Sequence, residues 1–294
     1  MEAPPRLTVG VVGVGRAGSV LAAALDRAGH RVVAVHAVSD TSRLRAEALI
    51  PQATLMTVPE VLKAAELVLV TVPDDVLPGL ISGLAESDQI QPGQFLVHAS
   101  GRYGVSVLAP ATKAGALPLA LHPVMTLTGT SLDLSRLAGC PFGVTAPEVL
   151  RPVAEALVVE MGGEPVWVAE QDRALYHAAL ANASNHLVTL VAQSMDLLER
   201  AGVADPGRML GPLMSASLDN ALRHGDPALT GPVVRGDAAT VEKHLDSLAA
   251  VSGESRTAYL AMARLTADRA LAAGLLPPAK AEALLDVLSR SDRP

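Results

Sequence analysis

The sequence predicts an α/β protein with a doubly wound sheet in its N-terminal half and an all-helical C-terminal domain. Up to about residue 169, short β-branched apolar runs alternate with helical stretches, and beyond it only helical periodicity remains. The 294 residues suffice for two domains, and a hydrophobic fraction of 50% can fill their cores. We therefore expect a doubly wound domain over residues 1–169 and a helical domain over residues 170–294.

A strand–helix–strand unit opens the chain. The run TVGVVGV at residues 8–14 has the length of a strand, SVLAAALDRAG is helical and stops at Gly29, and RVVAVHAV forms the next strand. The turn after the first strand has the spacing GxGxxG, which in this setting is typical of dinucleotide binding. The alternative is a doubly wound domain without a ligand.

The glycines of this turn have separate roles. Gly13 permits the tight turn, Gly15 leaves room for a pyrophosphate, and Gly18 lets the helix pack closely on the strand. The free N–H groups of the helix start then face an anion. We expect the cofactor to contact Gly13, Gly15, Arg16, Ala17 and Gly18.

The end of the second strand selects the cofactor. An NAD site usually has Asp or Glu there, but the position falls near His36. The following residues include Ser39 and Arg43, whose hydroxyl and guanidinium groups suit a 2′-phosphate. The sequence thus favours NADP, although Asp40 would bind a ribose if the strand runs longer. Further expected cofactor contacts are Val72 and Pro73, at the end of the strand ELVLVTVP (66–73).

Several polar residues follow later predicted strands. Because open α/β sheets bind ligands outside the carboxyl ends of their strands, these residues are candidates for the substrate site. They are Thr71, His98, Ser100 and His122.

Residues 170–202 form one long helical pattern. At about 100° per residue, Ser184 and Asn185 project on the same side as His177. These three residues can therefore share a cleft, whereas Asn182 and His186 project elsewhere. The alternative is that the polar groups only hydrogen-bond neighbouring helices. Further helices are predicted at 206–224, 237–251, 254–273 and 277–290.

Composition excludes several other classes of protein. Cys140 is the only cysteine, which rules out an intrachain disulfide and fits a reducing cytoplasm. The net charge of −7 and 2% aromatic residues argue against nucleic acid as a partner. We find neither a signal peptide nor an apolar stretch of membrane-spanning length. No metal-binding pattern appears, so we expect no metal.

Several stretches, among them GVVGVGRAG, HASG, ALHPVMTLTG and LYHAALANASNHL, resemble the 6-phosphogluconate dehydrogenase-like superfamily. The chain is more closely similar to a family that joins a Rossmann-like domain to a helical domain of unknown function. In the related ketopantoate reductases, the long helix carries a catalytic Lys and, eight residues later, a substrate-binding Asn. His177 and Asn185 match these positions, and Ala181 replaces an intervening Asn.

Other relatives bear on other residues. The pair His122-Pro123 resembles a motif of prephenate dehydrogenases, and Thr230 or Thr240 could match substrate-binding hydroxyls of pyrroline-5-carboxylate reductases. The segment Leu229–Asp237 either lies at a cleft or dimer interface, or simply breaks a helix and caps the next one through Asp237. Related reductases interlock their helical domains, so we expect a homodimer, with helix 254–273 as a candidate surface.

The resemblance implies an NADPH-dependent reductase of a small keto acid, most similar to ketopantoate reductase. His177 would protonate the carbonyl oxygen, and Asn185, Ser100 and His122 would complete the site. Two alternatives stay open: an imine reductase of the pyrroline-5-carboxylate reductase type, and an NADP(H)-binding sensor or scaffold without turnover.

Overall fold

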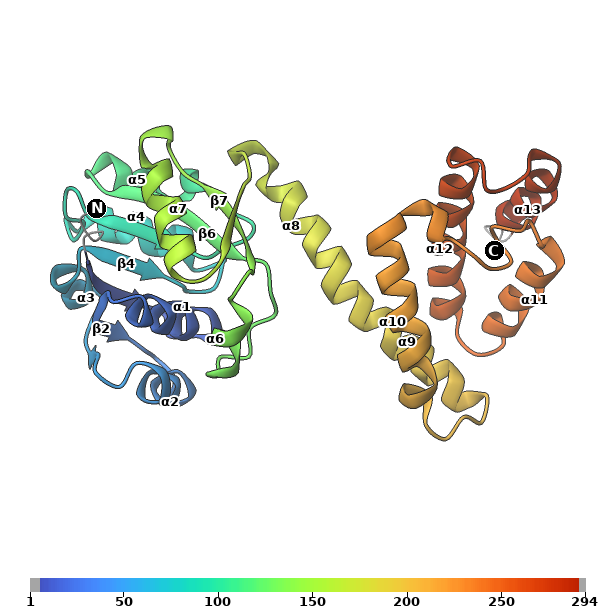
Figure 1. Ribbon diagram of the computed structural model, residues 1–294, viewed down its shortest axis with the longest axis horizontal. Helices are drawn as coiled ribbons and strands as arrows, with labels where there is room; N and C mark the ends of the chain where they lie inside the picture. Colours follow the sequence, from blue (N-terminus) through green and yellow to red (C-terminus); the bar gives the residue numbers. More distant parts are fainter. Residues whose placement is uncertain (1–5, 291–294) are drawn as a thin grey trace. The chain divides into compact units, whose positions relative to one another are not determined.

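The computed structural model describes residues 6–290, and the chain divides into two compact units between Ser184 and Asn185. The first unit is α/β and the second is all-helical (Figure 1), so the predicted fold class is confirmed. The unit boundary lies beyond the predicted division at 169/170. The start of the long helix belongs to the first unit, because its Arg173 side chain is hydrogen-bonded to the sheet.

The first unit contains an eight-stranded sheet in the order β3-β2-β1-β4-β5-β6-β7-β8. All neighbouring strands run parallel except β6 and β7, which are antiparallel. The carboxyl ends of β1, β4, β5 and β6 therefore share one edge of the sheet. The strands are β1 (Thr8–Val12), β2 (Arg31–His36), β3 (Thr54–Leu55), β4 (Leu67–Val70), β5 (Phe95–His98), β6 (Leu117–Pro123), β7 (Pro141–Thr145) and β8 (Glu164–Trp167).

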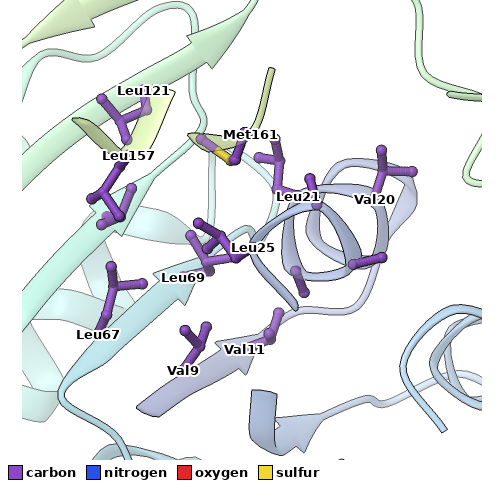
Figure 2. Close-up of a cluster of buried hydrophobic side chains, with 14 of the residues drawn as sticks. Val9, Val11, Val20, Leu21, Leu25, Leu67, Leu69, Leu121, Leu157 and Met161 are labelled. Atoms are coloured by element: carbon purple, nitrogen blue, oxygen red, sulfur yellow. The ribbon is translucent and has the colours of Figure 1, made fainter. Parts of the chain in front are cut away.

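Helices cover both faces of this sheet. One face packs against α1 (Arg16–Arg27) and α7 (Arg151–Glu160) through a mainly aliphatic part of the core, which includes Leu21, Leu25 and Leu157 (Figure 2). The second cluster of buried apolar residues lies under the helices of the other face. These are α3 (Val58–Ala64), α4 (Leu77–Glu86) and α5 (Ala109–Lys113); α2 (Asp40–Leu49) and α6 (Leu132–Arg136) complete the unit.

Sequence analysis overestimated the length of the first strand and did not predict several short helices and one short strand. Strand β1 ends at Val12 rather than residue 14, because Gly13 has a φ of +94° and begins the turn. The predicted helix 148–161 is α7 preceded by a 3₁₀ turn, Glu148–Leu150. Sequence analysis did not predict helices α2 to α6, none of which is longer than ten residues, or the two-residue strand β3.

The long helix is interrupted. It comprises α8 (Arg173–Ala181), a π-helical turn (Asn182–His186) and α9 (Leu187–Arg200). A π turn holds an extra residue, so the uniform step of about 100° that placed Asn185 and Ser184 beside His177 does not hold across it. The regular-helix geometry from which the three residues were expected to share a cleft therefore does not apply, and the shared cleft stays a prediction.

The second unit contains a bundle with its own core. Helices α11 (Ala238–Ala249), α12 (Gly253–Ala272) and α13 (Pro278–Arg290) pack around Val241, Leu260 and Leu284. Helix α10 (Pro206–His224) has the predicted bounds. The bounds of α11, α12 and α13 differ from the predicted ones by at most two residues.

The segment Leu229–Asp237 joins this bundle. Val233 and Val234 are buried in its core, and Asp237 caps α11 by accepting from the Thr240 N–H at 3.1 Å and the Thr240 hydroxyl at 2.7 Å. The predicted capping role of Asp237 is thus confirmed. Across residues 6–290, we find no helix with both the length and the apolar composition needed to cross a membrane.

Candidate active site

The glycine turn after β1 depends on close contacts that a β-carbon would prevent. A β-carbon on Gly13 would lie 2.9 Å from the backbone of Thr71, and one on Gly18 would overlap the Gly13 carbonyl and the Thr71 hydroxyl. Thr71 Oγ1 fixes this contact by donating to the Gly13 carbonyl at 2.6 Å. The turn and the start of α1 are therefore held against the carboxyl end of β4.

Gly15 differs from these two glycines. A β-carbon there would meet no atom within 4 Å, and its φ of −78° is accessible to any residue. Gly15 is also the N-cap of α1, which has no side-chain cap. The open space above Gly15 and the uncapped N–H groups fit the pyrophosphate of a dinucleotide.

Two of the predicted 2′-phosphate ligands have other partners. The Ser39 side chain caps α2, where it accepts from the Ser42 N–H at 3.2 Å. Arg43 is exposed and lies 3.6 Å from the carboxylate of Asp40. Both residues remain candidates, but Ser39 has a structural role that its position in the sequence did not reveal.

Two other arginines, Arg16 and Arg45, lie near the glycine turn. A β-carbon on Gly129 would lie 2.8 Å from Arg45 Nε and 3.1 Å from the Cα of Arg16, the first residue of α1. Neither arginine forms an ion pair within residues 6–290. Arg16 and Arg45 thus offer two guanidinium groups beside the turn, whereas Arg43, the arginine predicted from the sequence, lies on an exposed face of α2.

The remaining cofactor candidates follow β4. Val72 is half-buried and Pro73 is exposed, directly after the threonine that binds the Gly13 carbonyl. Ala17 lies half-buried in the first turn of α1. All three lie on the edge of the sheet that carries the glycine turn.

His98 and Ser100 build the turn after β5. His98 is fully buried, with Nε2 2.8 Å from the Gly104 carbonyl and Nδ1 accepting from the Ser100 N–H at 3.2 Å. Its Nε2 therefore carries the proton in the neutral ring. The Ser100 hydroxyl accepts from the N–H groups of Arg102 and Tyr103 at 3.2 and 3.3 Å. Both side chains hold the backbone of the turn around Gly101.

A histidine–tyrosine pair lies beside this turn. His122 Nδ1 is 2.8 Å from the hydroxyl of Tyr176, and the ring of His177 is 6.3 Å from that of His122. A β-carbon on Gly101 would lie 2.9 Å from His122 Nε2 and 2.8 Å from His177 Cδ2. Gly101 thus lets the two histidines approach the same point at the carboxyl end of β5.

Tyr176 reaches His122 across β7. Gly143 is paired with His122 in the antiparallel β6–β7 ladder, and a β-carbon on Gly143 would overlap the Tyr176 hydroxyl. The glycine is therefore what allows the tyrosine to reach the histidine.

The surroundings keep these groups neutral. Burial lowers the pKa of both His98 and His122 to about 4, with a further contribution from the positive charge of Arg173. Burial also raises the pKa of Tyr176 above its usual value. Near neutral pH the pair is thus an uncharged histidine and an uncharged tyrosine.

A neutral pair of this kind has one unused donor in either tautomer. When Tyr176 donates to His122 Nδ1, the Nε2–H of His122 is the unused donor; when Nδ1 donates instead, the unused donor is the Tyr176 hydroxyl. The arrangement can therefore supply a proton to a developing negative charge.

The structure gathers the glycine turn, Ser100, His122 and His177 within the first unit, whereas Asn185 begins the second. Sequence analysis missed Tyr176 and Arg173. Part of the signal was present: Arg173 precedes Tyr176 by three residues and His177 by four, and positions three or four apart share a helix face. The burial of Arg173 and the contact of Tyr176 with His122 depend on tertiary packing, which the sequence does not display.

A cavity of the first unit lies away from these residues. Its volume is about 830 Å³, and its lining includes Pro118 at the start of β6 and Thr145 and Trp167 near the ends of β7 and β8. Because β7 is antiparallel to β6, these residues mark the opposite edge of the sheet. This opposite edge carries no glycine turn, so we place the candidate active site at the edge where β1, β4, β5 and β6 have their carboxyl ends. No group of three metal-binding side chains occurs in the described part of the chain.

The strand order and the glycine turn define a Rossmann-like domain. Comparison of the sequence with protein families agrees: residues 2–123 match the Rossmann-like domain, and residues 140–266 match the domain of unknown function DUF2520. The chain therefore combines a Rossmann-like domain with a DUF2520 domain, the combination that the motifs predicted. No protein of curated function matches the sequence significantly.

Solved structures share this fold. A protein from Thermotoga maritima has a TM-score of 0.68 at 23% identity, covering 90% of this chain and 98% of its own. An imine reductase from Pseudomonas sp. has a TM-score of 0.65 at 21% identity, covering 97% and 100%. A reductive aminase from Aspergillus terreus, in complex with NADPH and ethyl levulinate, has a TM-score of 0.63 at 17% identity, covering 98% and 100%.

We expect the first unit to lose stability as the pH falls from about 6.5 to 4. The pKa of His98 is about 4 in the folded protein and near 6.5 when unfolded, so acid protonates the unfolded state first. His98 alone contributes about 3 kcal/mol to this loss. Urea unfolding at several pH values measures it, while NMR titration should show His98 uncharged at pH 5.5. A His98 that titrates near pH 6.5 in the folded protein would contradict the assignment.

Proposed function

We propose that this protein is an NADP(H)-dependent reductase that delivers hydride to a polar double bond, C=N or C=O, of a small molecule. The observation that supports it most is one of position. A glycine turn with open space above Gly15 lies on the same sheet edge as the His122–Tyr176 pair and His177. A hydride donor and a proton donor are the two components that such a reduction needs.

NADP(H) fits the residues around the turn better than NAD(H). No carboxylate ends β2, where His36 Nδ1 donates to the Met56 carbonyl at 3.0 Å. Arg16 and Arg45 lie beside the turn and suit a phosphate, and the reductase structures of similar fold include one with NADPH. The nicotinamide supplies the hydride; the protein's residues hold the phosphates, orient the substrate and provide the proton.

The proton would come from the cluster over Gly101. Either the His122–Tyr176 pair or His177 donates it to the nitrogen or oxygen that gains charge as hydride arrives. His98 and Ser100 act on this cluster by fixing the turn beneath it.

The chemistry of this cluster favours a C=N substrate. A neutral His–Tyr pair is a weak acid, and an imine nitrogen is more basic than a carbonyl oxygen, so it takes a proton from such a donor more readily. Two of the proteins of similar fold are an imine reductase and a reductive aminase. The keto acid remains the second candidate, supported by the match of His177 and Asn185 to the Lys and Asn of ketopantoate reductases.

Oxidation of NADPH at 340 nm tests the proposal. The substrates are pyrroline-5-carboxylate, a panel of cyclic imines and ketopantoate, each also run with NADH. We expect saturable oxidation with an imine and a preference for NADPH. Turnover of ketopantoate alone would support the second candidate. NADPH binding without turnover of any compound would refute the reductase and favour a sensor or scaffold.

Gly15→Val should abolish NADPH binding without unfolding the protein. The added β-carbon meets no protein atom within 4 Å, and the valine side chain would occupy the space that we assign to the pyrophosphate. Fluorescence titration with NADPH should show at least about a hundredfold weaker binding, equivalent to about 2.8 kcal/mol. The matched control is Gly83→Val on α4, where the added β-carbon also meets nothing within 4 Å. Equal affinity in both variants would refute the site.

His177→Ala and Tyr176→Phe separate the two proton donors. Loss of the true donor should lower kcat by about 10²–10⁴-fold and leave the affinity for NADPH almost unchanged. Tyr176→Phe keeps the ring over Gly143 and removes only the hydroxyl that contacts His122. Steady-state kinetics with both variants measure the effect. Full activity in both would exclude this cluster from the chemistry.

We also propose a homodimer that uses α9 and α10. Neither helix has a buried large apolar residue, and Leu213 and Leu222 of α10 are 64% and 80% exposed. Met209 and Leu213 lie on a different side of α10 from Leu218 and Leu222, so a partner must cover more than one side. The predicted surface on helix 254–273 is less suited, because the small residues of α12 pack into its own bundle.

Light scattering of the intact protein should therefore give the mass of a dimer. Leu213→Glu combined with Leu222→Glu should shift it to a monomer, because two carboxylates would be buried in the interface. The control pair, Leu44→Glu and Val149→Glu, lies at exposed positions of the first unit. A monomeric wild-type protein would contradict the proposal.

A further inference from the structure

Arg173 is the bulkiest of the fully buried side chains, although it carries a charge. It begins α8 and is 2% exposed. Its Nε donates to Thr145 Oγ1 at 2.7 Å, and its Nη2 donates to the carbonyls of Ala120 and Gly143 at 3.2 and 3.0 Å. Its Nη1 has no hydrogen-bond partner among the described residues.

A buried guanidinium without a carboxylate is costly, since charged groups are rarely placed in a core unpaired. Within residues 6–290, no acidic group forms an ion pair with Arg173. The acid that influences it electrostatically, Glu170, uses its carboxylate to accept from the N–H groups of Val105 and Ser106. An apolar side chain would serve packing better, so the charge calls for another explanation.

The partners of Arg173 surround the His122–Tyr176 pair. Ala120 precedes His122 by two residues on β6, and Gly143 is the residue paired with His122 on β7. Tyr176 follows Arg173 by three residues on α8, and its ring centroid lies 5.6 Å from the guanidinium carbon. One side chain therefore links the two strands and the helix that bring the histidine and the tyrosine together.

We propose that Arg173 is the positioning residue of the proton-donating site. Its planar guanidinium fixes the backbone segments that bring His122 and Tyr176 together, and its positive charge disfavours protonation of His122. Its role as a positioning residue in catalysis rests on the proposed reductase function, whereas its effect on the pair does not.

The electrostatics of the pair agree with this geometry. After burial, Arg173 is the strongest influence that lowers the pKa of His122; His177 and His98 act in the same direction, and Asp74 opposes them. For Tyr176, burial raises the pKa, and the Arg173 charge opposes that rise. Arg173 thus disfavours a protonated His122 and makes the Tyr176 hydroxyl a better donor.

Two variants separate charge from geometry. Arg173→Met removes the charge while keeping a long side chain, so the NMR titration midpoint of His122 should rise by about one pH unit, and the acidic limb of the kcat profile should move with it. Arg173→Lys keeps the charge but loses the planar fork, so the midpoint should stay low while kcat falls at least about tenfold. Arg151→Met, at the opposite edge of the sheet, should change neither.

The outcomes are distinct. An unmoved His122 midpoint in a folded Arg173→Met variant overturns the proposal and leaves Arg173 a packing residue. If Arg173→Met does not fold, Arg173→Lys decides: a His122 midpoint that rises toward the unfolded value overturns it. The NMR titration needs no substrate, so an enzyme assay that fails for every compound refutes the reductase and leaves this inference testable. Turnover with an unmoved midpoint refutes the inference alone.

Discussion

The close contact between the glycine turn and the end of β4 is the constraint on which the rest of the site depends. Thr71 donates to the Gly13 carbonyl, and the missing side chain of Gly18 lets α1 lie directly against both. This contact aims the uncapped start of α1 at the carboxyl edge of the sheet and leaves the space above Gly15 open. Because β4, β5 and β6 are parallel neighbours, the groups that end them reach the same edge.

Close approach through glycine recurs on the other side of this edge. Gly101 allows His122 and His177 to approach each other, and Gly143 allows the Tyr176 hydroxyl to reach His122. The same close packing partly buries His122, and this burial lowers its pKa and keeps the ring neutral. The close packing that Gly101 and Gly143 allow therefore also determines the protonation state of His122. The buried cation Arg173 lies beside the His122–Tyr176 pair and lowers the pKa of His122 further.

The sequence revealed the parts of this site that depend on local pattern. Hydrophobic periodicity and GxGxxG predicted the doubly wound sheet, the turn and the placing of His122 at a strand end. It could not reveal the π turn at 182–186, which depends on backbone geometry, or the pairing of Gly143 with His122, which depends on the antiparallel strand β7. The same holds for Tyr176, since its role arises only from that pairing.

Hydride transfer is the central claim, and isotope transfer tests it most directly. NADPH carrying deuterium at the transferable position of nicotinamide C4 is incubated with the best substrate of the panel, and the product is analysed by mass spectrometry. The account predicts one deuterium per product molecule, bound to the carbon of the former C=N or C=O bond. A product without deuterium, or a cofactor that keeps its label with every compound, would contradict it.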